Sequence, residues 1–270
     1  MRRRSLASRR QDRTNKILGS LIFFISIAVI AVPGYFYFIK GNENELDKKS
    51  LCPANGPTGH VILLVDKTDS LTFIQKEAFL LFLGEFAKSI VKEGELFSVF
   101  ALGEDYKESP KAVFEICNPG NGDNKSVWTD NPERFRHEYN DSFIKPMNAL
   151  ANLLVTSNPG STSPILEMLQ MVSINGFREH HINGQKRLYI FSDMLINTPN
   201  YSHYHGNIDY DSFKNSPSSS KLKLDFEGVK VEIEYLINTP AIQTRKHLLF
   251  WEKLFSDSGA HLSSVNIVEG

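Results

Sequence analysis

The sequence predicts an α/β fold in which helices cover both faces of a mostly parallel central sheet. Short apolar segments alternate with longer stretches whose apolar residues recur every three or four positions, which is typical of this class. The clearest segment, Val61 to Val65, is apolar throughout, as in a strand buried on both faces. Residues 17–39 carry no charge and stand apart from this pattern. We therefore expect one transmembrane helix and then one α/β domain at 60–270.

Six segments have the length and apolar content of strands. The first, 60–65, runs directly into Asp66. The others are 95–102, 111–117, 187–191, 229–237 and 261–268. The third is followed by Pro119 and Gly120, which break regular structure.

Four stretches have helical periodicity: 71–93, 132–155, 164–176 and 244–256. Gly94 should end the first as a cap glycine. Pro146 should divide the second into two helices. The third should begin at Pro164, with Ser163 as its cap.

Residues 196–220 are polar and aromatic and predict a long surface loop. The loop contains His203 and His205, and His180 and His181 precede the fourth strand. We expect these loop histidines to be exposed to solvent rather than to bind a transition metal.

The charge-free segment 17–39 has 23 residues, and about 20 suffice to span a bilayer. Seven of the first 16 residues are Lys or Arg, and short basic flanks stay in the cytoplasm. This pattern predicts a basic cytoplasmic tail at 1–16, a transmembrane helix at 17–39, a linker at 40–59 and an extracytoplasmic domain, periplasmic if the source is bacterial. A cleaved signal peptide is the alternative. It would have a shorter apolar run and a small-residue cleavage site, which this segment lacks.

Charge is distributed unevenly along the 270 residues. Residues 1–40 hold eight Lys/Arg and one acid, which leaves 22 basic and 30 acidic residues and a net charge of −8 beyond them. An acidic domain argues against nucleic-acid binding. The two cysteines, Cys52 and Cys117, form no CxxC and no Cys/His cluster, which argues against zinc. They are either a disulfide in an oxidising compartment or two unrelated thiols.

Oxygen-bearing side chains follow two of the predicted strands. Asp66, Thr68 and Ser70 come directly after the first strand, and Asp193 comes after the fourth. Ligands of open α/β sheets bind at the carboxyl ends of the strands. Two carboxylates brought together there repel each other unless a cation or a proton lies between them. Oxygen ligands suit a hard cation such as Mg2+, or alternatively Mn2+ or Ca2+.

The spacing of Asp66, Thr68 and Ser70 resembles the metal-ion-dependent adhesion site (MIDAS) of von Willebrand factor A (VWA) domains, with Thr in place of the first Ser. The resemblance covers roughly residues 58 to 268. It implies a VWA/Rossmann-like fold and a second metal loop at Gly160–Pro164, with Asp193 in the third. The second-loop ligand is either Thr162, by residue type, or Ser163, because Pro164 follows it.

Three functions are compatible with these features. The resemblance implies a non-enzymatic binding module in which a protein partner supplies an acidic side chain to the metal. A Mg2+-dependent hydrolase of the phosphatase type is an alternative, with Asp66 as nucleophile. Thr68 argues against it, because haloacid-dehalogenase-like phosphatases place a second Asp there. The third possibility is a structural component of an envelope or secretion assembly with an empty site.

Overall fold

The computed structural model describes all residues except 1–5, 44–45, 104–109, 124–130, 157–159 and 181. His181 and part of the predicted second metal loop therefore lie outside the described residues. The chain divides into two compact units. The first holds helix α1 (Leu6–Glu43), and the second consists of residues 46–52 and 56–270. Part of the stretch predicted as a linker thus belongs to the second unit.

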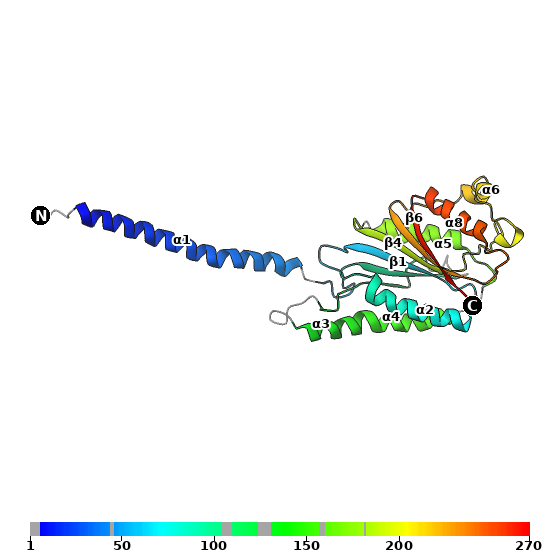
Figure 1. Ribbon diagram of the computed structural model, residues 1–270, viewed down its shortest axis with the longest axis horizontal. Coiled ribbons are helices and arrows are strands. Elements are labelled where there is room, and N and C mark those ends of the chain that lie inside the picture. The colour runs from blue at the N-terminus through cyan, green and yellow to red at the C-terminus, as the bar shows by residue number, and fades with distance from the viewer. Residues whose placement is uncertain (1–5, 44–45, 104–109, 124–130, 157–159, 181) are drawn as a thin grey trace. The chain divides into compact units, whose positions relative to one another are not determined.

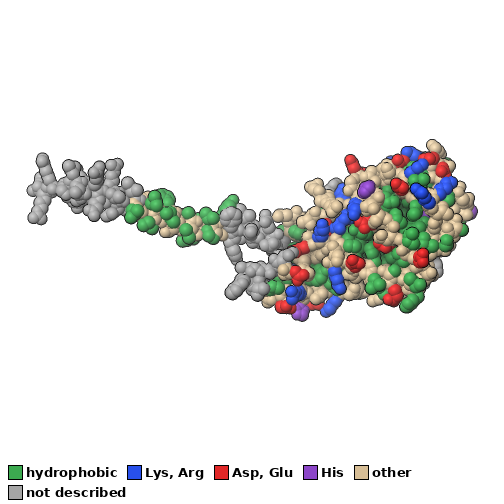
Figure 2. Space-filling model, viewed as in Figure 1, with side chains coloured by type: hydrophobic (Ala, Val, Ile, Leu, Met, Phe, Trp, Pro, Cys, Tyr) green, Lys and Arg blue, Asp and Glu red, His purple; other side chains and the backbone are tan. Residues whose placement is uncertain are grey.

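Helix α1 contains the apolar segment that the sequence predicts to span a membrane. Its window Leu18–Tyr35 has a mean hydropathy of 2.1, and none of the window is buried. Figure 2 shows hydrophobic side chains along this part of α1. Among the described residues it is the one helix that is long and apolar enough to cross a bilayer.

The second unit is built on a six-stranded sheet with the order β3-β2-β1-β4-β5-β6. All neighbouring strands are parallel except β3, which runs antiparallel to β2. The mostly parallel sheet confirms the predicted fold class. The strands are β1 (Gly59–Asp66), β2 (Leu96–Leu102), β3 (Phe114–Cys117), β4 (Gln185–Ser192), β5 (Val229–Leu236) and β6 (His261–Val268).

Helices cover both faces of this sheet (Figure 1). Successive side chains of β1 point to opposite faces, so Val61 and Leu63 pack into one core cluster and Ile62 and Leu64 into the other. The first cluster is covered by α2 (Phe73–Glu85), α3 (Pro132–Tyr139) and α4 (Lys145–Val155). The second is covered by α5 (Ile165–Met171) and α8 (Arg245–Asp257). Burial on both faces explains why the β1 sequence is apolar throughout.

Two of the predicted helices differ from the sequence prediction in where they begin or end. Helix α2 continues as a π-helical turn, Phe86–Ile90, and then ends at Val91 instead of at Gly94. The side-chain amide of Asn118, which follows β3, donates to the Val91 carbonyl at 2.6 Å. This hydrogen bond replaces a helical one and favours the end of the helix at Val91.

The predicted division of the second stretch near Pro146 is present: a π-helical turn at Asn140–Ile144 separates α3 from α4, and Pro146 lies in the first turn of α4. Helix α5 begins at Ile165, with Pro164 at the cap position, and continues as a π-helical turn at Val172–Arg178. The prediction that Ser163 caps this helix is wrong, because the backbone of Ser163 pairs with Asn197 instead.

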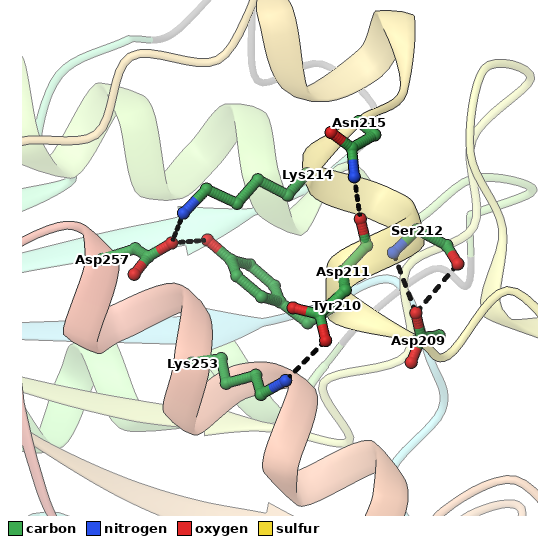
Figure 3. A network of polar contacts seen from close by, with 8 residues as sticks. All are labelled: Asp209, Tyr210, Asp211, Ser212, Lys214, Asn215, Lys253 and Asp257. Atoms are coloured by element: carbon green, nitrogen blue, oxygen red, sulfur yellow. Dashed lines mark hydrogen bonds and ion pairs between the residues drawn. The ribbon is translucent and has the colours of Figure 1, made fainter.

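The prediction of a surface loop at 196–220 is also wrong. The segment contains a 3-10 turn at His203–His205 and two short helices, α6 (Tyr210–Lys214) and α7 (Pro217–Ser220). The prediction did not take into account that aromatic side chains of this segment are buried. Tyr201, Tyr210 and Phe213 pack around Phe250 of α8. Figure 3 shows the polar contacts that accompany this packing, in which Asp257 of α8 accepts hydrogen bonds from Tyr210 and Lys214 of α6.

A disulfide between Cys52 and Cys117 joins the start of the second unit to β3. Next to it, the Cys117 amide donates to the Ser50 carbonyl at 2.8 Å. The segment that precedes β1 is therefore fixed to one edge of the sheet.

Candidate metal centre

Asp66 ends β1, and its carboxylate is buried within the first loop. Its Oδ1 accepts hydrogen bonds from the Thr68 amide at 2.9 Å and from the Thr68 hydroxyl at 2.7 Å. Its Oδ2 accepts from the Ser192 hydroxyl at 2.7 Å. The loop thus holds the carboxylate in a fixed orientation, with Thr68 folded back onto it.

Asp193 directly follows β4, the neighbour of β1, so the parallel register brings the two acids to the same edge of the sheet. Its Oδ1 accepts from the Leu195 amide at 2.9 Å, and its Oδ2 accepts from the Asn238 side chain at 3.2 Å. Gln243 donates to the Asp193 carbonyl at 3.0 Å. Asp193 is therefore held on its backbone and side chain by residues after β5.

The electrostatics of the pair are unfavourable for two ionised carboxylates. Burial raises the pKa of Asp66. Burial and then the nearby negative charges of Asp66 and Asp69 raise the pKa of Asp193 well above its ordinary value. Neither Asp66 nor Asp193 forms an ion pair with any residue that the structure describes. Such an arrangement favours a proton or a cation at the site.

The second loop brings hydroxyl groups to the same place. Ser163 is 5% exposed, and its Oγ is buried without a hydrogen-bond partner among the described residues. Its backbone pairs with Asn197 through bonds of 2.7 and 3.1 Å, and the Gly160 amide donates to the Thr68 carbonyl at 2.8 Å. A hollow of about 30 Å³, large enough to admit a water molecule, lies between the loops. Its lining includes Thr68, Asp69, Thr162, Ser163 and Tyr204.

The structure thus brings together most of the residues that the sequence singled out. Asp66, Thr68 and Asp193 converge at one sheet edge, and Thr162 and Ser163 line the hollow with Thr68. Ser70 is exposed at the end of the first loop. The sequence prediction missed Ser192 and Asn238, which bond to the two acids. The sequence feature that pointed to Asp66 also applies to Ser192 and Asn238, because each is a polar residue at or just beyond the end of a buried strand.

The donor set fits a hard divalent cation. It consists of carboxylate and hydroxyl oxygens, which are the ligands that Mg2+ prefers. The orphaned Ser163 hydroxyl and the two uncompensated carboxylates are the groups that such a cation would satisfy. Within the described part of the chain, no cluster of three or more His, Cys, Asp or Glu side chains could hold a metal. Hydroxyls would therefore have to complete any metal shell at this edge.

His203 departs from the expected exposure, because its side chain is only 1% exposed. Its Nδ1 lies 3.0 Å from Nε2 of His247, whose Nδ1 lies 2.6 Å from the Tyr235 hydroxyl. Burial lowers the pKa of His203 to about 3 and that of His247 to about 4, so both are neutral at pH 7.

The rings of His203 and His247 contact the backbone of the loop after Asp193, at Ile196 and Met194, and support it. His247 Nε2 and Trp251 Nε1 both lie 3.1 Å from the carbonyl of Met194. Met194 has a φ of 59°, which is uncommon for a residue with a side chain. The buried contacts explain how that conformation is held next to Asp193. Of the other predicted loop histidines, His205 is exposed, and His180 contacts Glu115.

No known protein family and no curated protein matches the sequence. Solved structures do match. The SpRpn10 VWA domain has 11% identity and a TM-score of 0.38, over 78% of this chain and 88% of that one. The conserved hypothetical protein BatB from Bacteroides thetaiotaomicron has 10% identity and a TM-score of 0.39, over 78% and 90%. An aerotolerance-related membrane protein from Bacteroides fragilis NCTC 9343 has 9% identity and a TM-score of 0.36, over 77% and 90%. Such low values concern the fold alone, so the site rests on the geometry of this chain.

Proposed function

We propose that this protein is a membrane-anchored VWA-like binding module. It would hold Mg2+ in a MIDAS-type site and bind an acidic side chain of a protein partner outside the cytoplasm. One observation carries the proposal: Asp66 and Asp193 are both buried at one sheet edge, and no ion pair with a described residue compensates either charge. A divalent cation supplies that charge and leaves a coordination position for a partner's carboxylate.

We propose the following ligand roles. Asp66, Thr68 and Ser70 would contribute from the first loop, and Asp193 from the third, partly through water. In the second loop we assign the ligand to Ser163 rather than to Thr162, because the Ser163 hydroxyl is buried and has no described partner. Asn238 and Ser192 would orient the two carboxylates.

A binding role is favoured over a hydrolase role by the environment of Asp66. Both of its carboxylate oxygens already accept hydrogen bonds, from Thr68 and from Ser192. Such bonds stabilise the anion and make it a weaker nucleophile. We therefore infer that Asp66 acts as a ligand rather than as a nucleophile, and we propose a non-enzymatic role for the protein.

Metal binding is tested on the full-length chain in detergent, first stripped with EDTA and then titrated with Mg2+. If the site is real, free Mg2+ at ten times its Kd should stabilise the fold by about 1.4 kcal/mol. Asp193→Asn should abolish this gain, and Asp225→Asn, which changes an exposed acid elsewhere, should keep it. Equal Mg2+ responses of the wild type and Asp193→Asn would rule out this site.

Partner binding is tested by quantitative affinity capture from solubilised membranes, with Mg2+ or with EDTA. A specific partner should be retained by the wild type in Mg2+ and lost both in EDTA and with Asp193→Asn. A partner that is retained equally under all three conditions would show that interaction does not pass through the metal.

A further inference from the structure

The two edges of the sheet are protected to very different degrees. At one edge, β3 has only four residues, and the Cys117 amide bonds outward to Ser50 beside the disulfide. At the other edge, β6 has eight residues, His261–Val268, and contains no Lys, Arg, Asp, Glu or Pro. Proteins usually protect an edge strand with charges, Pro or a covering segment, because exposed strand edges pair with other chains. The one protective feature of this kind in β6 is an irregularity in its pairing with β5, where the register shifts between Val231 and Glu232.

One hydrogen bond shows which backbone groups of β6 face β5 and which face outward. The Ile237 amide donates to the Val268 carbonyl at 3.0 Å, so the backbone of Val268 faces β5. Backbone groups of successive residues in a strand point to alternate edges. The N–H and C=O groups of Val265 and Ile267 therefore face away from β5. No backbone hydrogen bond from a described residue reaches them.

Side chains along this edge define what a pairing strand would meet. Val265 packs on the core cluster that includes α8, and Ile267 lies on the same face and is 63% exposed. Asn266 lies on the opposite face and donates to Glu234 of β5 at 2.7 Å. One face of the edge is thus apolar, and the other is polar and acidic.

Glu234 lacks a cation among the described residues. The neighbouring Lys230 pairs with Glu232 at 2.7 Å, and Glu234 receives only the Asn266 amide. Burial and the charge of Glu232 raise the pKa of Glu234. A strand added to β6 would lie about 10 Å from β5, since neighbouring strands are about 4.8 Å apart. An extended Lys or Arg side chain can reach across Asn266 over that distance.

We propose that the free edge of β6 binds an extended segment of a partner protein, which adds a seventh strand to the sheet. The segment would place apolar residues beside Val265 and Ile267 and a Lys or Arg towards Glu234. A second copy of this chain fits less well, because β6 holds no Lys or Arg to offer. The surface is separate from the candidate metal centre and needs no metal.

The test uses the full-length chain in detergent with EDTA and a ten-residue peptide in which valine and lysine alternate. Two matched peptides carry N-methyl groups, one on every valine amide and the other on every lysine amide. In a strand, only one of these sets of amides faces β6, so one methylated peptide should bind at least tenfold more weakly than the parent. Simple charge attraction would treat both methylated peptides alike, and that result would overturn the proposal.

Variants of the protein test whether the peptide binds at the edge of β6. Ile267→Pro removes an outward-facing N–H and should weaken peptide binding at least tenfold, since edge strands tolerate Pro at such positions. Glu234→Gln should also weaken it, and Glu252→Gln, on the exposed surface of α8, should not. In case Ile267→Pro perturbs folding, hydrogen exchange on the wild type gives a second measurement. The peptide should protect the amides of Val265 and Ile267.

Several outcomes would contradict the proposal. Failure of the parent peptide to bind, or unchanged exchange of those two amides, would overturn it. A dimer of the full-length chain that Ile267→Pro disrupts would assign the edge to a second copy instead. None of these results bears on the metal centre, because all measurements are made in EDTA.

Discussion

Asp193 is a residue whose ionised form is disfavoured in the folded, metal-free protein. Its raised pKa means that folding disfavours the ionised carboxylate, and the charges of Asp66 and Asp69 add to the effect of burial. A group whose pKa is raised in the fold binds protons more tightly in the folded state. Metal-free stability should therefore increase as the pH falls from neutral towards the unfolded-state value near 3.8.

Replacing this carboxylate by an amide should consequently stabilise the metal-free protein. Asp193→Asn keeps an oxygen for the Leu195 amide but removes the charge next to Asp66. We expect a gain of roughly 1 kcal/mol at pH 7 in EDTA, reduced somewhat by the contact with Asn238. Chemical unfolding in EDTA measures it. A loss of stability there would mean that the two acids do not repel each other in the folded protein.

His180 and Glu115 form a second titrating pair, away from the candidate centre. His180 Nε2 lies 3.1 Å from Glu115, and His180 Nδ1 lies 2.8 Å from the Gly176 carbonyl. Only the imidazolium can donate both bonds. The hydrogen bond to Glu115 raises the pKa of His180. Hydrogen bonds from His180 and Ser98, with the His180 charge, lower the pKa of Glu115 despite its burial.

The pH dependence of this pair follows from those directions. The contribution of His180 is complete below its unfolded pKa of 6.5 and is lost as the pH rises through the raised folded value. We expect His180→Gln to cost roughly 0.5–1 kcal/mol more at about pH 5.5 than at about pH 8.5, because both side chains are partly exposed. Urea unfolding at the two pH values measures the difference. An equal cost at both would show that His180 is neutral throughout.

At the scale of elements, strands were predicted better than helix ends. The apolar runs of β1, β2, β4 and β5 mark their positions to within two residues, because both faces of these strands are buried or nearly so. Helix ends depend on contacts with distant parts of the chain. The end of α2 is set by Asn118, which lies more than 20 residues away and has no local signal.

The segment 196–220 was mispredicted for a related reason. Its helices α6 and α7 have five and four residues, too short for a periodic pattern to show. The segment is ordered by aromatic packing on α8, as with Phe213 against Phe250. This packing depends on a helix more than 30 residues further along the chain, so the local sequence does not predict it.

The disulfide should contribute strongly to the stability of the second unit. It closes a loop with a sequence separation of 65 residues and fixes the segment before β1 to the β3 edge. The chain-entropy relation gives about 4 kcal/mol for a loop of this length. Urea unfolding of wild type and of the double variant Cys52→Ala, Cys117→Ala measures it. A difference below about 1 kcal/mol would mean that the unfolded chain is already constrained in this region.

For the whole molecule, the candidate site was predictable because it follows from topology. Asp66 and Asp193 end adjacent parallel strands, and the carboxyl ends of such strands share one edge. What the sequence left open was which of the polar residues near the strand ends orient these acids. Asn238 lies two residues beyond the end of β5, and its contact with Asp193 depends on the register of β5 against β4.

The proposed membrane anchor would determine where this site operates. The basic residues before the apolar segment of α1 predict a cytoplasmic N-terminus, and the disulfide is typical of an oxidising compartment beyond the membrane. The full-length chain should therefore stay with membranes after an alkaline carbonate wash. A thiol introduced by Ser256→Cys, on the exposed surface of α8, should react with a membrane-impermeant maleimide in intact cells. One introduced by Ser8→Cys should react only after the cells are opened.

The same experiment separates an uncleaved anchor from a signal peptide. Both native cysteines are bonded to each other, so labelling reports the introduced thiol alone. An anchor gives a full-length product in the membrane fraction with the two thiols on opposite sides. A signal peptide gives a shorter soluble product that has lost the Ser8→Cys thiol. In that case the partner would meet a freely diffusing domain, and the metal site would have to provide its affinity without the concentrating effect of the membrane.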